Sequence, residues 1–341
     1  MQLALELGAK GIGLTSPNPP VGAVIVANGQ AIGKGWHHRA GLPHAEREAI
    51  RDAIERGHED LLAGATLYVT LEPCCTQGRT PACTDAIIER KIGRVVFGAT
   101  DPNPKHAGAA VALLEAHGIE TVSGVLEAEC CRLIRSFAQT MIHGRPWVIV
   151  KTAMSLDGRI TRQPGRSQWL TSELARNRVH TLRARVDGIL TGGETVRRDC
   201  PALTIRTPDA PVSPDKIQPW RFVATQHPET LPMSAPLFTD EYSDRTVIVP
   251  SVTDWKGLME RFYQDYGVST LLVEAGGHLI RELLNEHLVD EWVGFYAPMI
   301  LGGSTLSVAG GDFLTDEIHL KIQEWQCIGQ DFLISGLVDY D

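Results

Sequence analysis

The chain has 341 residues, of which 43% are hydrophobic and 21% are charged, so it is long enough for two globular domains. Its net charge of −9 disfavours a protein that follows a nucleic-acid backbone, because such proteins need a basic surface. No apolar run approaches the roughly 20 residues of a membrane span, and the start of the chain lacks the pattern of a signal peptide. The seven cysteines, an odd number, disfavour a secreted disulfide framework. We therefore expect a cytoplasmic protein that binds neither nucleic acid nor a membrane.

The first 125 residues alternate predicted strands with predicted helices. The strands are apolar runs bounded by turn residues, and the helices lack internal glycine and proline. Strands separated by helices of this length predict a three-layer αβα sheet. The predicted strands are 21–26, 66–71, 94–98 and 118–122, and the predicted helices are 45–56, 80–91 and 109–117.

A second set of strands begins after His143-Gly144-Arg145-Pro146, where we place a domain boundary. This position predicts one domain over 1–143 and a second over 146–341. The proline-rich stretch 207–219 is interpreted as a loop, because strand patterns continue after it. The strands of the second domain are predicted at 147–152, 188–191, 221–224, 246–249, 270–274 and 291–296, with two more near the C-terminus.

The sequence His44-Ala45-Glu46, followed by Cys74 and Cys83, carries the clearest chemical signal. One histidine and two thiolates fit a catalytic zinc site in which the fourth position is left for water. Zinc lowers the pKa of that water, and a carboxylate beside the metal can move its protons. This combination is typical of zinc nucleobase deaminases.

The spacing of these residues restricts where the metal can lie. On a regular helix His44 and Glu46 would point about 200° apart, so both can reach one metal only beyond the helix N-terminus. Pro43 fits such a helix start. Cys83 follows the cap and proline at 80–81, in a first helical turn where the helix dipole favours a thiolate.

Two other interpretations of these residues remain open. Cys75 could complete a structural zinc site with four protein ligands, although adjacent cysteines do not easily ligate one tetrahedral metal. Glu46 could be a solvated charge on the helix surface, which its spacing from His44 disfavours. The remaining cysteines are interpreted as packing residues: Cys130, Cys131, Cys200 and Cys327.

At this point the first domain resembles the deaminase half of the RibD family of riboflavin-biosynthesis enzymes. The resemblance rests on Ser-Pro-Asn-Pro-Pro-Val-Gly at 16–22, on His44-Ala45-Glu46, on the nine-residue offset from Cys74 to Cys83, and on Asp-Pro-Asn-Pro at 101–104. Nucleoside and tRNA deaminases usually have Pro-Cys-x-x-Cys instead. The chain departs from the family at Cys75-Thr76, where Ser-His is common. The resemblance implies zinc on His44, Cys74 and Cys83, Glu46 as proton shuttle, and substrate contacts from Asn18, His37, Asp101 and Asn103.

Polar and glycine-rich segments follow several predicted strands of the second domain. Lys151 lies on a strand, with Ser155 and Asp157 just past its end, where open α/β sheets bind ligands. The glycine pairs at 192–193 and 276–277 each open a helix, so that backbone amides can approach a phosphate. Neither pair is Gly-x-Gly-x-x-Gly, and a Rossmann domain is not predicted. Taken alone, each pair indicates only a helix-start turn.

The order of these segments resembles the reductase half of the same family over nearly all of 146–341. That domain is similar to dihydrofolate reductase in fold and uses NADPH. The resemblance implies that Lys151 polarises or orients the reacting group and that the arginines hold a sugar phosphate, although a lone Arg183 or Arg206 is more often a surface charge. It implies cofactor contacts at Ala153, Trp169, Thr195, Asp199 and Gly276, and substrate contacts at Ser167, Arg183, Leu203, Arg206 and Glu274.

The resemblance predicts an α/β protein in which a cytidine-deaminase-like domain precedes a dihydrofolate-reductase-like domain. The first, with one zinc ion, would deaminate 2,5-diamino-6-(5-phosphoribosylamino)pyrimidin-4(3H)-one. The second would use NADPH to reduce the ribosyl group of 5-amino-6-(5-phosphoribosylamino)uracil to ribityl. We expect a homo-oligomer. The alternatives are a nucleoside or tRNA deaminase with an appended binding domain, which the charge and the cysteine spacing oppose, and a non-enzymatic zinc-stabilised module.

Overall fold

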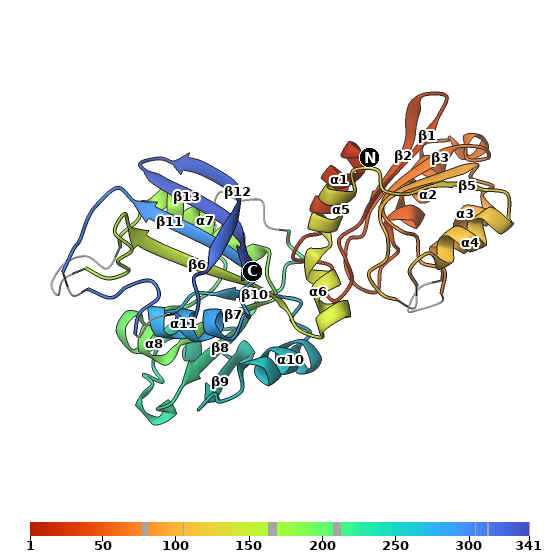
Figure 1. The fold of residues 1–341 in the computed structure, drawn as a ribbon. Coiled ribbons are helices and arrows are strands. Elements are labelled where there is room, and N and C mark those ends of the chain that lie inside the picture. The colour runs from red at the N-terminus through yellow and green to blue at the C-terminus, as the bar shows by residue number, and fades with distance from the viewer. Residues whose placement is uncertain are drawn as a thin grey trace. The chain divides into compact units, whose positions relative to one another are not determined.

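The computed structural model describes residues 1–76, 81–104, 106–162, 169–206, 213–303, 305–311 and 314–340. It divides the chain into two compact units, Met1–Gly144 and Arg145–Asp341 (Figure 1). Each hydrophobic core cluster draws its residues from one unit alone. Among the described residues no helix has the length and apolar character needed to cross a membrane.

The first unit is built on a five-stranded sheet with the order β2-β1-β3-β4-β5. Strand β1 pairs antiparallel with β2 and β3, whereas β3, β4 and β5 run parallel. The parallel strands therefore end at one edge of the sheet, and the segments after β3 and β4 meet there. The strands are β1 (Gly22–Ala27), β2 (Gln30–Trp36), β3 (Thr66–Leu71), β4 (Arg94–Ala99) and β5 (Glu120–Val122).

Helices cover both faces of this sheet. Ala23 and Ile25 face one side and pack with residues of α2, whereas Val24 faces the other side and packs with residues of α1. Successive strand residues point to opposite faces, so this alternation confirms the predicted three layers. The helices are α1 (Gln2–Ala9), α2 (Ala45–Glu55), α3 (Cys83–Glu89), α4 (Ala109–Ala116), α5 (Glu127–Leu133) and α6 (Arg135–His143), with a short 3-10 turn at η1 (Glu59–Leu61).

The strand β2 was not predicted from the sequence. Its glycines explain both the weak pattern and the packing, because they let α2 approach the strand closely. A Cβ on Gly33 would lie 2.2 Å from the Ala49 carbonyl oxygen, and one on Gly35 would lie 2.4 Å from the Ala49 nitrogen. The predicted helix at 80–91 begins at Cys83 in the structure, and residues 77–80 lie outside the described part.

The second unit contains an eight-stranded sheet with the order β12-β13-β11-β6-β10-β7-β8-β9. The strands from β11 to β9 run parallel, and β13 and β12 are added antiparallel at one side. Ser155, predicted just past the first strand, is its last residue. The strands are β6 (Trp147–Ser155), β7 (Gly188–Gly192), β8 (Trp220–Thr225), β9 (Thr246–Pro250), β10 (Thr270–Val273), β11 (Glu291–Ala297), β12 (His319–Ile328) and β13 (Asp331–Asp339).

Two core clusters lie on the two faces of this sheet. Val148 and Val150 pack with residues of α10 and α11, and Ile149, which points the other way, packs with residues of α7 and α8. The helices are α7 (Glu173–Ala184), α8 (Gly193–Asp199), α9 (Pro236–Thr239), α10 (Trp255–Tyr266) and α11 (Gly277–Asn285), with 3-10 turns η2 (Pro228–Thr230) and η3 (Ser243–Arg245). The described part of the proline-rich stretch, 213–219, has neither helix nor strand.

Candidate active sites

The structure brings His44, Cys74 and Cys83 together as one group of potential metal ligands. The Nδ1 atom of His44 lies 3.5 Å from the Cys74 sulfur and 3.4 Å from the Cys83 sulfur. A tetrahedral zinc ion, with Zn–S near ~2.3 Å and Zn–N near ~2.0–2.1 Å, separates sulfur and nitrogen ligands by about 3.5 Å. The three donor atoms therefore fit zinc. Cys75 does not belong to this described group.

Local backbone structure explains how these ligands meet. His44 is the extended N-cap residue of α2, and Cys83 is the first residue of α3. The backbone N–H of Cys83 donates to both the carbonyl oxygen and the sulfur of Cys74, at 3.0 and 3.3 Å. The two helix starts therefore converge on the loop after β3, as the spacing in the sequence required.

The sulfurs carry the charge that a cation needs. Hydrogen bonding from Cys83, together with the hydrogen bond to His44, lowers the pKa of the Cys74 thiol to about 4 against the effect of burial. The hydrogen bond between the two cysteine side chains, together with burial, raises the pKa of the Cys83 thiol. The pair alone thus shares one negative charge, and a divalent cation would stabilise both residues as thiolates.

Glu46 lies beside the three ligands and is not a solvated surface charge. It is only 3% exposed, although it is the second residue of α2. Burial raises the pKa of its carboxyl group, which also has a hydrogen bond to the Cys83 side chain. A buried carboxyl group with a raised pKa is suited to exchange protons near neutral pH.

A cavity of about 190 Å³ opens onto this group. Three of the four residues expected to contact the deaminase substrate line it, namely Asn18, His37 and Asp101. His37 is buried, its Nδ1 atom donates to the Pro43 carbonyl oxygen, and its Nε2 atom accepts from the Asn18 amide. Burial lowers the pKa of His37, so the neutral ring holds the Asn18 amide in one orientation.

Asn103 is not among the lining residues of the cavity, but its backbone belongs to the same loop. Its N–H donates to Oδ1 of Asp101 at 2.8 Å, which folds the loop after β4 into a tight turn. The lining residues that were not predicted as site residues include Glu72 and Phe137. Glu72 was detectable as a carboxylate directly after a predicted strand, whereas Phe137 comes from α6, for which no local signal pointed to the site.

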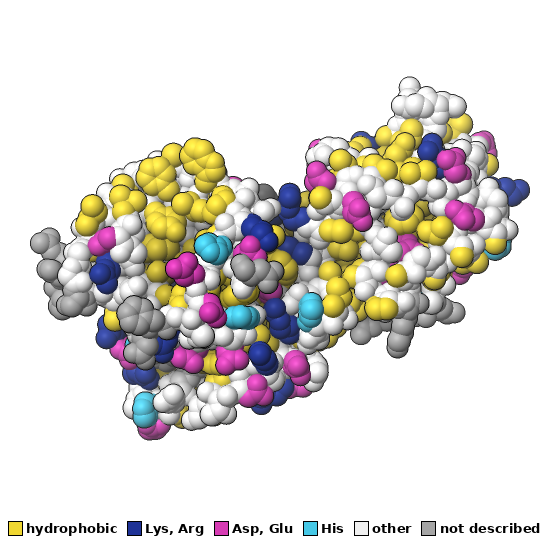
Figure 2. Space-filling view, in the orientation of Figure 1, with side chains coloured by type: hydrophobic (Ala, Val, Ile, Leu, Met, Phe, Trp, Pro, Cys, Tyr) yellow, Lys and Arg dark blue, Asp and Glu magenta, His cyan; other side chains and the backbone are white. Residues whose placement is uncertain are grey.

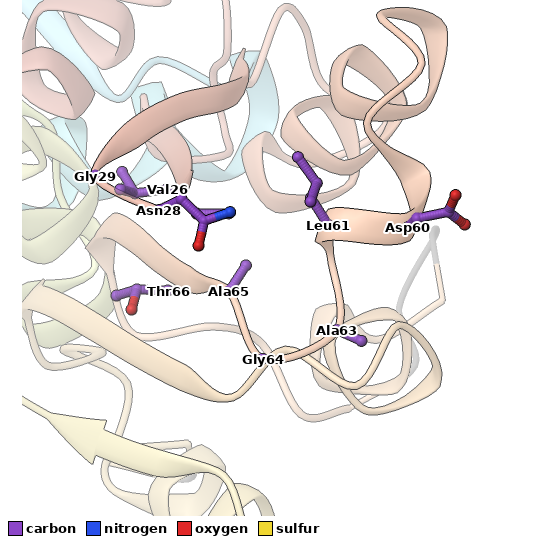
Figure 3. Close-up of a pocket in the computed structure, with 10 residues that line it drawn as sticks. Val26, Asn28, Gly29, Asp60, Leu61, Ala63, Gly64, Ala65 and Thr66 are labelled. Carbon is purple, nitrogen blue, oxygen red and sulfur yellow. The ribbon is translucent and has the colours of Figure 1, made fainter.

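A second hollow of the first unit, of about 280 Å³, lies between the β1–β2 turn and the segment that enters β3 (Figure 3). Most of its ten lining residues are small, such as alanine and glycine. Asp60 is the charged residue among them, and Figure 3 shows its side chain directed away from the cavity. This lining offers no acid–base pair, and it is not a candidate for catalysis.

In the second unit, Lys151, Arg183 and Glu274 form a buried charged cluster. Arg183 donates to both carboxylate oxygens of Glu274, at 2.6 and 3.0 Å, and to the Thr204 carbonyl oxygen at 2.9 Å. The Lys151 ammonium lies 3.8 Å from Glu274. Burial alone would raise the pKa of Glu274, but the two cations lower it to about 2, and burial lowers the pKa of Lys151.

The surface-charge interpretation of Arg183 is therefore wrong, because the residue is only 9% exposed and each of its three side-chain nitrogens donates one hydrogen bond. Arg206 is exposed, and its backbone N–H donates to Nδ1 of His180 at 3.1 Å. The side chain of Leu203 is buried in the core, where the backbone has a positive φ of 53°. Only its backbone is left for a substrate contact.

The remaining predicted residues of the second unit lie on separate elements. Ala153 is on β6, Thr195 and Asp199 are on α8, and Gly276 is the N-cap of α11. Trp169 is exposed, with the Arg176 guanidinium 5.0 Å from its ring centroid. Ser167 lies outside the described residues. Cys131, Cys200 and Cys327 are exposed, which corrects their interpretation as packing residues, whereas Cys130 is buried.

The fold and the two sites define a bifunctional enzyme, in which a zinc-type nucleobase deaminase precedes an α/β reductase. Residues 1–99 match the model of the cytidine and deoxycytidylate deaminase zinc-binding region, and residues 146–334 match the RibD C-terminal domain. The chain is 37% identical to the riboflavin biosynthesis protein RibD of Synechocystis, over 98% of this chain and 95% of that protein. It is 36% identical to RibD of Escherichia coli, over 97% and 96%.

Two solved structures agree over the full length. Acinetobacter baumannii RibD has a TM-score of 0.90 at 34% identity, covering 99% of this chain and 97% of that one. A Thermotoga maritima diaminohydroxyphosphoribosylaminopyrimidine deaminase/5-amino-6-(5-phosphoribosylamino)uracil reductase has a TM-score of 0.87 at 34% identity, covering 98% and 96%. The chain belongs to the RibD family of bifunctional deaminase/reductases of riboflavin biosynthesis. The predicted fold class and the general function are confirmed.

Proposed function

We propose that the first unit deaminates 2,5-diamino-6-(5-phosphoribosylamino)pyrimidin-4(3H)-one hydrolytically. The observation that carries this proposal is the buried Glu46 beside three zinc-type ligands at the end of a cavity. His44, Cys74 and Cys83 would hold the metal. Bound zinc would supply a Lewis acid that lowers the pKa of a water molecule at its fourth position.

The protein's own residues then handle the protons and the substrate. Glu46 takes a proton from the attacking water and delivers protons to the ring nitrogen and to the amine, which leaves as ammonia. Asn18, oriented by His37, and the loop of Asp101 and Asn103 recognise the pyrimidine edge. Because hydroxide replaces an amino group on a ring carbon, the reaction needs neither oxidant nor reductant.

We propose that the second unit reduces the ribosyl group of 5-amino-6-(5-phosphoribosylamino)uracil to ribityl with NADPH. NADPH would supply a hydride to C1′ of the ribose, while the C1′–O4′ bond opens and O4′ takes up a proton from water. Lys151, held beside Glu274, orients or polarises the reacting group. Five residues bind the substrate: Arg183, Arg206, Ser167, Glu274 and, through its backbone, Leu203. The guanidinium groups of the two arginines bind its phosphate.

The start of α11 supports the cofactor assignment. Gly276 and Gly277 carry no side chain that could cap the helix, so its first N–H groups are available to an anion. Apart from its chain neighbours, no described residue has an atom within 4 Å of the position of a Cβ at Gly276, whereas a Cβ at Gly277 would lie 2.3 Å from the Ser307 carbonyl oxygen. The open position at Gly276 fits a phosphate group of NADPH, with Ala153, Trp169, Thr195 and Asp199 as further cofactor contacts.

We assign the two activities to residues 1–143 and 146–341, and we propose that the enzyme is a cytoplasmic homo-oligomer. An apolar surface on the second unit supports self-association, because the described residues of β12 and β13 expose Trp325, at 76%, together with Ile322 and Phe332. Figure 2 shows hydrophobic side chains gathered on this side of the unit. Exposed apolar patches of this kind are typical of interfaces. Sedimentation of the full chain tests the oligomer.

The two reactions are tested separately on the full-length protein. Ammonia release from the diaminopyrimidine measures the deaminase, and NADPH oxidation with the deaminated substrate measures the reductase. We expect both activities in one preparation. Absence of ammonia release from a zinc-loaded protein would contradict the first assignment, and absence of NADPH oxidation would contradict the second.

A further inference from the structure

Glu72 joins two parts of the deaminase site that the sequence separates. It follows β3 directly and is only 4% exposed. Its carboxylate accepts three backbone hydrogen bonds, from the N–H groups of Asp101 at 3.2 Å, Gly108 at 3.0 Å and Ala110 at 3.2 Å. The side chain therefore connects the end of β3 with the loop after β4 and with the start of α4.

Two of these N–H groups, those of Gly108 and Ala110, belong to the start of α4. The first N–H groups of a helix have no intrahelical acceptor, and Gly108, the N-cap of α4, has no side chain to supply one. The first turn of α4 contains no acidic residue either. Glu72 supplies the acceptor from another strand, and its negative charge interacts favourably with the helix dipole.

Glu72, which caps α4, also lies close to the active site. It stands two residues before Cys74, which is grouped with His44 and Cys83, and its side chain lines the same cavity as Asp101. A shift of the carboxylate would therefore move the substrate loop relative to the metal ligands. A displacement of the substrate by about 1 Å lowers activity strongly, even when the residue that causes it does not touch the reacting atoms.

We propose that Glu72 is a positioning residue of the deaminase, which holds the loop of Asp101 and Asn103 at a fixed place relative to Cys74. The proposal rests on the proposed function, because it takes that loop as a substrate-binding element. It assigns Glu72 no contact with the reacting atoms. A purely structural helix cap would stabilise the unit without changing how the folded enzyme binds its substrate.

The test is the Glu72→Gln variant of the full-length, zinc-loaded enzyme. Glutamine keeps the shape of the side chain, but it removes the charge and presents an NH₂ group to backbone donors. We expect the KM of the deaminase to rise about 10-fold or more, the loss expected for a hydrogen bond to a charged group. We expect kcat to change less than KM, with zinc content and reductase activity unchanged. Amide hydrogen exchange over 99–110 should be faster than in the wild type.

Glu48→Gln is the matched control. Glu48 is another buried carboxylate of the same unit, 5% exposed, which pairs with Arg51 on α2 and lies 3.8 Å from His38, and both of these partners lie outside the substrate loop. Its KM should equal that of the wild type. If Glu72→Gln does not fold, Glu72→Asp is used to test the proposal, because it keeps the charge and shortens the side chain by one methylene. For Glu72→Asp we expect a KM between that of the wild type and the ~10-fold increase expected for Glu72→Gln.

A wild-type KM in Glu72→Gln or in Glu72→Asp at full zinc occupancy overturns the proposal. So does a loss of Vmax alone in proportion to unfolded protein, since this is the result expected for a structural cap. Failure of the proposed function has a different signature, because the wild-type enzyme itself would then release no ammonia from the diaminopyrimidine.

Discussion

Arg183 and Glu274 are joined by two parallel hydrogen bonds of 2.6 and 3.0 Å, although they lie 91 positions apart in the chain. The guanidinium comes from α7, and the carboxylate comes from the residue after β10. The paired geometry fixes both side chains, and the third nitrogen of the Arg183 guanidinium, Nη1, donates to the Thr204 carbonyl oxygen. Arg183 therefore links the loop that carries Leu203 and Arg206 to Glu274 through hydrogen bonds.

Replacement of these arginines should weaken the reductase. We expect Arg183→Ala or Arg206→Ala to raise the reductase KM for the phosphorylated substrate at least ~10-fold, in line with ~1.5–3 kcal/mol for a charged hydrogen bond. Arg183→Ala should also lower kcat, because it leaves the Glu274 carboxylate buried beside Lys151 alone. Arg183→Lys should restore little, since an ammonium group cannot make the paired bonds. Steady-state kinetics with the deaminated substrate provide the measurement.

The defect should be confined to the reaction of the reductase with its substrate. Deaminase activity and NADPH affinity are the internal controls, and both should stay close to the wild-type values. A normal KM for the substrate, or a defect confined to NADPH binding, would show that these arginines do not bind the substrate.

Glu46→Gln should abolish deamination while zinc stays bound. The structure places Glu46 beside the ligand group but not in it, so the substitution removes proton transfer and leaves the metal ligands intact. Loss of general acid–base catalysis lowers the rate ~10²–10⁴-fold or more. Ammonia release and metal analysis on the same preparation check this. Loss of zinc in this variant would mean that Glu46 is itself a ligand.

Removal of the metal should separate the two activities. His44→Ala, or treatment of the wild type with a chelator, should eliminate ammonia release together with zinc, because two sulfurs alone make a poor catalytic site. NADPH oxidation with the deaminated substrate should continue, since the charged cluster of the second unit contains none of the three ligands. The result to look for is parallel loss of zinc and ammonia release at constant reductase activity. Equal loss of both activities would contradict the assignment.

A fragment of residues 146–341 should reduce the deaminated substrate by itself. The second unit has its own core clusters on both faces of its sheet. Arg145, just before the fragment, is paired with Asp290 at 2.7 Å, and a fragment that begins at 145 is a useful companion because it keeps this pair. Circular dichroism and NADPH oxidation check folding and activity. A folded but inactive fragment would show that the reductase site takes residues from the first unit or from another subunit.

Much of this protein could be predicted from local patterns. The apolar strand at 66–71 has the same bounds in the structure, because burial of a strand leaves a direct trace in its composition. The helix start after His44 also followed from the sequence, since Pro43 and the ligand spacing restrict where a shared metal can lie. The helix predicted from residue 80 begins later, at Cys83, which is still in the first turn of the predicted helix. The zinc chemistry and the family followed from short motifs, each of which lies within a few consecutive residues.

The tertiary structure decided which distant groups meet. The strand β2 is recognisable only through its packing on α2, since its glycines weaken the local strand pattern. The pairing of Arg183 with Glu274, and the capping of α4 by Glu72, join segments that no sequence period relates. Sequence patterns record that a residue becomes buried, but not which partner it finds, because that choice depends on how strands and helices pack in three dimensions. At Glu274, for example, the two cations supplied by distant segments lower the pKa of the carboxyl group although burial alone would raise it.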